Sequence, residues 1–184
     1  MPASPEFVRG SPLLEEAYEL AVEAHHGARR RNDTNIDHPA AVGRLLHAEG
    51  FDDEVVAAAL LHDVVEDTDT DLAEIAERFG PRVAELVCVM TEDASIELYE
   101  ERKSEHRARV AGHSSRAAAI YAADKLAKTQ ALQHDGGRIS EAKLHHYRQT
   151  LIELREAYPE LPFLAQLEDA LRALDADREH AGHR

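Results

Sequence analysis

The chain has 184 residues, of which 43% are hydrophobic and 31% charged, a composition typical of a globular protein rather than a disordered one. Its 36 acidic and 21 basic residues give a formal net charge of −15, which disfavours broad nucleic-acid binding because an acidic surface repels a phosphate backbone. The single cysteine, Cys88, excludes a disulfide framework, and no apolar stretch reaches the roughly 18 residues that a membrane span needs. We therefore expect a cytoplasmic protein that binds neither nucleic acid nor a membrane; a monomer and a homodimer both remain open.

Apolar residues recur at helical spacing along most of the chain and predict an all-α fold. Asp71 and Glu74 form a capping box that begins one helix, and the Gly80-Pro81 pair ends it. The expected helices cover residues 12–27, 39–50, 52–67, 71–80, 82–92, 96–111, 114–132, 140–157 and 160–178. Because no strand-like alternation and no interdomain linker interrupts this order, the sequence predicts a single domain over residues 1–184, a compact orthogonal helical bundle.

Ionisable residues interrupt two of the most apolar helical runs. His62 and Asp63 stand in one such run, and Asp124 follows another. A buried carboxylate is costly unless a cation, a metal or a dense set of hydrogen bonds compensates it. For Asp124 the simpler alternative is an ion pair with Lys128 at i+4, and for His62 it is a histidine satisfied within the core. Two acids and a histidine in apolar surroundings nevertheless favour a bound cation.

A further imidazole comes from the end of the polar loop over residues 28–37. Pro39 restricts His38 to an extended backbone at the start of a helix, where its ring can offer a nitrogen inward; a flanking role without a ligand is the alternative. Two imidazoles and two carboxylates without cysteine suit Mn²⁺, Fe²⁺ or Co²⁺ in an open octahedral site better than structural zinc.

The order His38, His62-Asp63, Asp124 resembles the H…HD…D signature of the HD-domain metal-dependent phosphohydrolases. More narrowly, the chain resembles the hydrolase domain of RelA/SpoT proteins and the stand-alone small alarmone hydrolases. The matching segments lie within residues 17–132 and include the run HDVVEDT from His62 and the later ADKL at 123–126. The resemblance implies an all-α fold of the HD-domain type and hydrolysis of the 3′-pyrophosphate of the alarmones ppGpp and pppGpp.

The resemblance also assigns roles to individual residues. One metal ion, typically Mn²⁺, would be held by four side chains: His38, His62, Asp63 and Asp124. Glu66 and Asp67 match an acidic pair that positions or activates the attacking water. A solvated helix end is the alternative for this pair, and the helix dipole mildly disfavours acids there.

Basic residues supply the expected substrate contacts. Arg29, Arg30 and Arg31 form the one dense basic cluster of the sequence and would attract a polyphosphate, although a solvated basic run is the alternative. Arg30 aligns with a substrate-contacting arginine of the family. Lys103 and Lys125 are further candidates for phosphate or nucleotide contacts.

The chain departs from the family at positions that read the nucleotide. Lys128 stands where the family has an asparagine that contacts the nucleotide, and residues 32–35 replace a stretch that commonly holds a tyrosine and a Gly-Thr-Pro turn. Hydrolysis is therefore better supported than guanosine specificity. An HD phosphohydrolase for another nucleotide or a phosphorylated dinucleotide, or a nucleotide-binding module without turnover, stays open. His145 and His146 are expected on an exposed helix face without a specific role.

Overall fold

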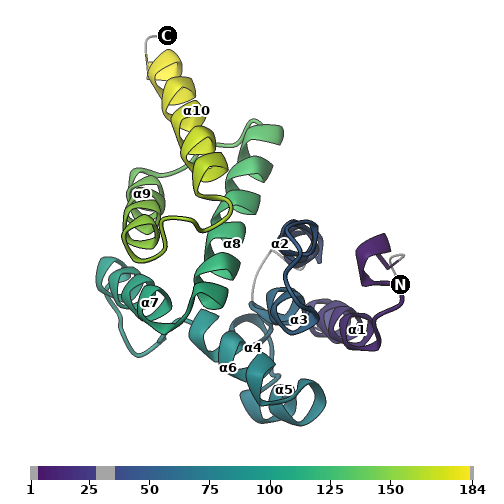
Figure 1. Cartoon of the computed structure of the whole chain (residues 1–184). Coiled ribbons are helices and arrows are strands. Elements are labelled where there is room, and N and C mark those ends of the chain that lie inside the picture. Colours follow the sequence, from purple (N-terminus) through teal and green to yellow (C-terminus); the bar gives the residue numbers. More distant parts are fainter. Residues whose placement is uncertain (1–3, 28–35, 183–184) are drawn as a thin grey trace. The chain divides into compact units, whose positions relative to one another are not determined.

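A computed structural model describes residues 4–27 and 36–182 of the chain. These residues form helices and connecting turns with no strand, which confirms the all-α prediction (Figure 1). The elements in chain order are a short 3-10 helix η1 (Glu6–Val8), α1 (Pro12–Gly27), α2 (Asp37–Ala48), α3 (Asp53–Leu61), α4 (Val64–Asp67), α5 (Leu72–Phe79), α6 (Pro81–Met90), α7 (Tyr99–His113), α8 (Ser115–His134), α9 (Glu141–Ala157) and α10 (Leu164–Gly182).

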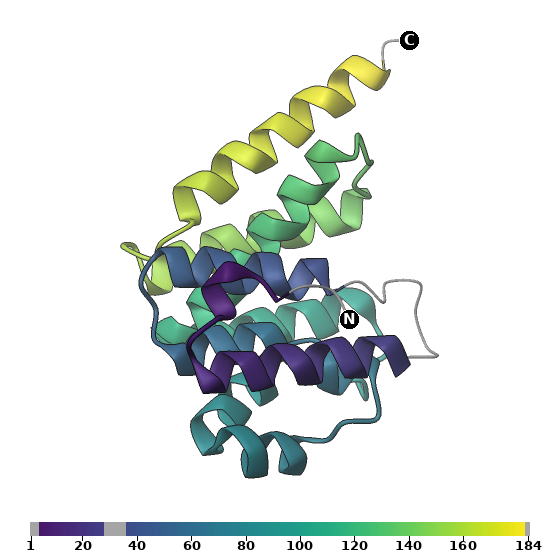
Figure 2. The same ribbon diagram turned by 90° about the vertical axis from the view of Figure 1, so that its right-hand side faces the viewer.

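The helices divide into two compact units, Met1–Glu92 and Asp93–Arg184. In the first unit, α3 is the central helix, and every residue from Val55 to Leu61 is fully buried. It packs against α1, α2 and α6, and Figure 2 shows α3 between α1 and α2. The apolar sequence of α3 on all sides follows from this central position.

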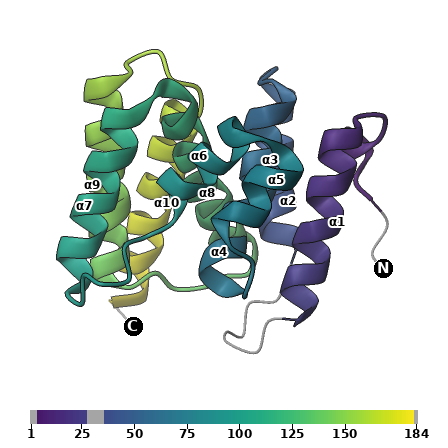
Figure 3. The ribbon, with the colours of Figure 1, turned by 90° about the horizontal axis from the view of Figure 1, so that it is seen from below.

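In the second unit, α8 is the central helix. Its residues 117–127 are all buried, and it packs against α7, α9 and α10. Helices α7 and α9 lie side by side, as Figure 3 shows. The expectation of a single domain stays a prediction.

Side-chain caps fix several helix starts where the sequence places them. The carboxylate of Asp71 accepts a hydrogen bond from the N–H of Glu74 at 2.9 Å, and Ser140 accepts from the N–H of Lys143 at 3.3 Å. Gly80 separates α5 from α6 with a φ of 86°, a left-handed value that glycine adopts without strain.

The structure corrects three details of the expected helices. The helix predicted over 52–67 is interrupted at His62 and Asp63, so that α3 and α4 are separate. The last helix continues to Gly182 rather than 178, and the helix expected over 39–50 begins at Asp37, so that the backbone of His38 is helical rather than extended as its position before Pro39 predicted. Within the described residues, no helix combines the length and the apolar character that crossing a membrane would require.

Candidate metal centre

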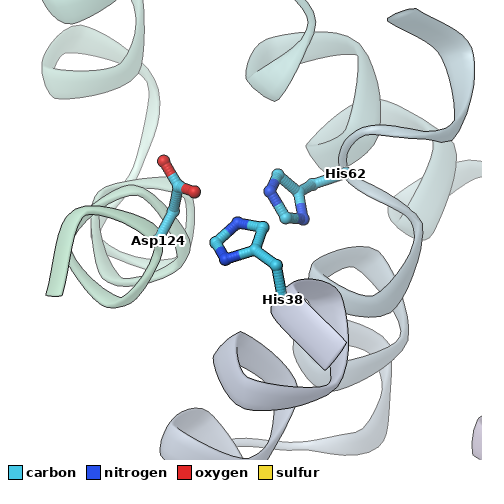
Figure 4. A group of neighbouring side chains, drawn as sticks. All are labelled: His38, His62 and Asp124. Carbon is cyan, nitrogen blue, oxygen red and sulfur yellow. The ribbon is translucent and has the colours of Figure 1, made fainter. Parts of the chain in front are cut away.

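The first unit brings together three of the predicted metal ligands. His38 lies in the first turn of α2, His62 directly follows α3, and Asp63 precedes α4. The Nε2 atom of His38 lies 3.9 Å from Oδ2 of Asp63, and Nε2 of His62 lies 3.1 Å from Oδ1. The two imidazole rings meet edge to face with centroids 5.3 Å apart (Figure 4). A cation bound to the Asp63 carboxylate would therefore lie close to both imidazoles.

The hydrogen bond to the Ala59 carbonyl determines which nitrogen of His62 can be a ligand. Nδ1 of this buried ring lies 2.8 Å from the carbonyl oxygen of Ala59. A carbonyl only accepts, so Nδ1 carries the hydrogen in the neutral ring and Nε2 presents a lone pair. That lone pair faces a carboxylate oxygen of Asp63 at 3.1 Å. Two acceptors at this distance need a cation, a proton or a metal ion, between or beside them, and a ring held by a backbone carbonyl is the usual form of a histidine ligand.

The same hydrogen bond explains the interruption between α3 and α4. In an uninterrupted helix the carbonyl of Ala59 would accept a hydrogen bond from the N–H of residue 63. Here it accepts from the ring of His62, and the regular pattern stops after Leu61. The break thus follows from the orientation of a site side chain.

Glu66 and Asp67, the predicted catalytic acids, lie on the single turn of α4. The side chain of Glu66 is exposed, but neighbouring protein atoms keep part of the water away from its carboxylate. Desolvation is the main cause that raises the pKa of Glu66, and Asp63 raises it further; a hydrogen bond from the N–H of Glu92 to Oε1 opposes both. Asp67 is half-buried.

Asp124 belongs to the second unit, where it projects from α8 (Figure 4). Its side chain is 2% exposed and carries two ion pairs: Oδ2 lies 2.6 Å from Nζ of Lys125, and Oδ1 lies 2.7 Å from Nζ of Lys128. The ion pair that the sequence offered as an alternative for Asp124 is therefore present. The second lysine, adjacent in sequence, was not anticipated in this role.

Lysines gather around this carboxylate. Burial lowers the pKa of Lys143, and the positive charges of Lys128, Lys125 and Lys103 lower it further, against one opposing effect of Asp124. We call these four residues, Lys103, Lys125, Lys128 and Lys143, the lysine cluster. In a chain of net charge −15 such a concentration of cations suits a phosphate ligand. The sequence predicted Lys103 and Lys125 as phosphate contacts, and this assignment stays a prediction.

The expectation for His146 is wrong: this residue is 2% exposed, whereas His145 is exposed as expected. Its Nδ1 atom lies 3.0 Å from Nη1 of Arg107, and its Nε2 lies 3.4 Å from the hydroxyl of Tyr121. Because a guanidinium only donates, Nδ1 accepts and Nε2 carries the hydrogen. Burial, followed by the charges of nearby Lys125, Lys103 and Arg107, lowers the pKa of His146 to about 2, so the ring is neutral at physiological pH.

A helical pattern in the sequence could have revealed this residue. Leu144, Tyr147, Leu151 and Leu154 are buried at spacings of three and four along α9, which places position 146 beside the apolar face. The predicted phosphate contacts Arg29, Arg30 and Arg31 lie outside the described residues.

Comparisons with known proteins identify the family of the chain. A family model described as an HD domain matches residues 17–151. Guanosine-3′,5′-bis(diphosphate) 3′-pyrophosphohydrolase of Aquifex aeolicus is 43% identical over 95 residues, which cover 51% of this chain and 14% of that protein. The enzyme of the same description from Danio rerio, MESH1, is 39% identical over 120 residues, 62% of this chain and 66% of that protein. The match thus spans less than two thirds of the length of either relative.

A solved structure gives a similar result over more of the chain. It is described as a metazoan ortholog of SpoT that hydrolyzes ppGpp, and it superposes with a TM-score of 0.73 at 29% identity, covering 93% of this chain and 97% of that one. With 93% of this chain covered, the aligned residues include most of each unit. Since the family model covers well over half of the sequence and includes the His62-Asp63 pair, this chain belongs to the HD-domain family.

Proposed function

We propose that this chain is a metal-dependent phosphohydrolase that removes the 3′-pyrophosphate of ppGpp. The observation that carries the proposal is the arrangement of His38 and His62 around the carboxylate of Asp63, with the lone pair of His62 turned toward it. The relatives named as ppGpp 3′-pyrophosphohydrolases support the choice of substrate.

Four side chains would hold one divalent ion in this proposal: His38, His62 and Asp63 from the first unit and Asp124 from the second. Imidazole and carboxylate ligands without a thiolate fit Mn²⁺, which we expect, and equally admit Fe²⁺ or Co²⁺. When bound, such an ion supplies a Lewis acid for a phosphoryl oxygen and acidifies a water molecule. The Ala59 carbonyl contributes by holding His62 in the tautomer that can bind.

Glu66 and Asp67 would manage the proton of the attacking water. A carboxylate with a raised pKa accepts a proton near neutral pH more readily than an ordinary one, and the N–H of Glu92 fixes the Glu66 carboxylate in place. The water oxygen forms a bond to the phosphorus attached to the ribose 3′-oxygen, and the bond between that phosphorus and the 3′-oxygen breaks. The acidic pair takes a proton from the water and returns a proton to the departing 3′-oxygen, so that the products are GDP, with a free 3′-hydroxyl, and pyrophosphate.

Cationic side chains would bind the phosphates of the substrate. We assign this role to Lys103 and Lys125 of the lysine cluster and to the three arginines of residues 29–31. Their charge offsets the strongly acidic character of the rest of the chain. The cytoplasmic location stays a prediction from the sequence, which leaves both a monomer and a homodimer open.

The proposal is tested by pyrophosphate release from ppGpp. Protein stripped of metal is assayed with and without Mn²⁺, beside an Asp63→Ala variant. We expect release only with Mn²⁺ and none from the variant. If Mn²⁺ binds but ppGpp stays intact, a panel of other nucleotides and phosphorylated dinucleotides decides the substrate; nucleotide binding without turnover of any of them would show a binding module and refute the proposal.

A further inference from the structure

We infer that Lys128 is an exchangeable counter-ion of Asp124: it occupies one carboxylate oxygen when no metal is bound and yields that oxygen to a divalent cation. This inference rests on the metal site of the proposed function. It concerns the order in which metal and anionic substrate bind, because the lysine that is displaced carries a charge that a phosphate can use.

The two lysines on Asp124 are held very differently. The side chain of Lys125 is 8% exposed, and its Nζ lies 4.1 Å from the ring centroid of Tyr121 and 5.7 Å from that of Tyr147. Aromatic faces stabilise a cation, most strongly where water is excluded. Lys125 is therefore a fixed partner of Oδ2, and it remains there whatever happens at the other oxygen.

Lys128 pairs with Oδ1 from one helical turn further along α8, and its side chain is 33% exposed. An ion pair of this exposure at i,i+4 is weak, because water solvates the ammonium group nearly as well when the pair opens. Of the two oxygens, Oδ1 is thus the one that a cation can take. A divalent cation there would repel the ammonium group of Lys128 and move it toward solvent.

The displaced ammonium group returns a full positive charge to the lysine cluster. Among the neighbouring positive charges, that of Lys128 lowers the pKa of Lys143 the most, so the two groups already interact. With Oδ1 of Asp124 engaged by a metal, this carboxylate no longer neutralises Lys128. The binding site for phosphate therefore becomes more cationic when metal binds, and we expect metal to bind before the anionic substrate.

The affinity for Mn²⁺ of the metal-stripped, full-length chain tests the exchange directly. The signal of free Mn²⁺ in electron paramagnetic resonance measures binding without any turnover. Lys128→Met removes the competing cation, and we expect Mn²⁺ to bind about tenfold more tightly. Lys128→Arg keeps the charge and should bind within about twofold of the original chain. Lys128→Gln repeats the neutral substitution if the methionine variant folds poorly.

Lys143→Met is the matched control, because it removes the same charge from the lysine cluster but no ion pair from Asp124. Its effect on Mn²⁺ affinity should be about twofold or less. Equal tightening by Lys143→Met and Lys128→Met would mean a general effect of charge and would overturn the exchange. Unchanged affinity in both neutral Lys128 variants would overturn it as well.

The failure of this inference is distinguishable from failure of the proposed function. If the original chain binds no Mn²⁺ and releases no pyrophosphate, the metal site itself is wrong. If the original chain binds Mn²⁺ and hydrolyses ppGpp while the Lys128 variants bind Mn²⁺ no more tightly, only the exchange is wrong. Asp124→Asn, which should weaken Mn²⁺ binding, confirms that the titration reports on this carboxylate.

Discussion

The carboxylates of the two units are stabilised in opposite ways. In the first unit, Asp63 is about one fifth exposed and lies beside the imidazoles of His38 and His62. In the second, Asp124 is buried between the ammonium groups of two lysines. The first carboxylate lies beside two imidazoles that can also bind a metal ion, whereas the second is paired with two ammonium groups of the chain itself. The two carboxylates that we propose as metal ligands thus differ in how strongly the chain itself compensates their charge.

The largest expected effect is on the stability of the metal-free protein when each carboxylate is removed. Asp124→Ala leaves the buried Lys125 without its counter-charge, so we expect the free energy of unfolding to fall by about 3–5 kcal/mol. Asp63→Ala removes a carboxylate that is partly exposed to solvent, and the expected change is within about 1 kcal/mol. Urea denaturation of both variants measures this contrast. Similar losses in the two would show that Asp63 is as firmly compensated as Asp124.

Neutralising an acid of α4 should affect turnover without affecting stability. Glu66→Gln removes the proposed proton acceptor, and kcat for pyrophosphate release is expected to fall about 10²–10³-fold. Mn²⁺ affinity and the midpoint of unfolding should stay near those of the original chain, because the Glu92 N–H still meets an acceptor oxygen. Glu77→Gln, an exposed change on α5, is the control. Full activity in Glu66→Gln would remove this residue from the mechanism.

The second unit should also show a pH dependence that originates at His146. Its pKa falls from an ordinary 6.5 to about 2 on folding, so between these values the unfolded chain binds a proton that the folded chain does not. Stability therefore declines as pH falls below 6.5, by about 2 kcal/mol at pH 5 from this ring alone. Lys125, Lys103, Arg107 and Asp124 are the charged groups that act on it.

His146→Asn retains an acceptor for Arg107 but cannot titrate. Urea unfolding at pH 7 and pH 5 should therefore show a smaller loss of stability in this variant than in the original chain, by about 2 kcal/mol. The exposed neighbour provides the control, since His145→Asn should leave the difference between the two pH values nearly unchanged. An identical loss in both variants would mean that His146 is protonated in the folded protein.

The first unit was predictable in more detail than the second because its signals are local in sequence. His62 and Asp63 are adjacent and interrupt an apolar run, and Asp71 caps its helix through a residue three positions away. The interruption after Leu61 was not predictable, because it depends on a ring-to-carbonyl hydrogen bond that periodicity does not encode.

The second unit depends on contacts between distant helices. Arg107 on α7 meets His146 on α9 and also binds Glu153 at 2.9 Å. Likewise, Lys125 reaches the ring of Tyr147 from another helix. The spacing within α9 can place His146 beside the apolar face, but it does not show that Arg107 and Tyr121 are its partners.

The smallest effects test whether the two units unfold as one domain, as the sequence predicts. Asp71→Ala removes a helix cap in the first unit and Ser140→Ala removes one in the second, each at a cost of about 1 kcal/mol. Hydrogen exchange of peptides from α3 and α8 then reports on each unit separately. If unfolding is cooperative over the whole chain, either variant lowers the protection of both peptides by the same amount. If each variant lowers protection only in its own unit, the two carboxylate environments belong to separately folding bodies and the single-domain prediction is wrong.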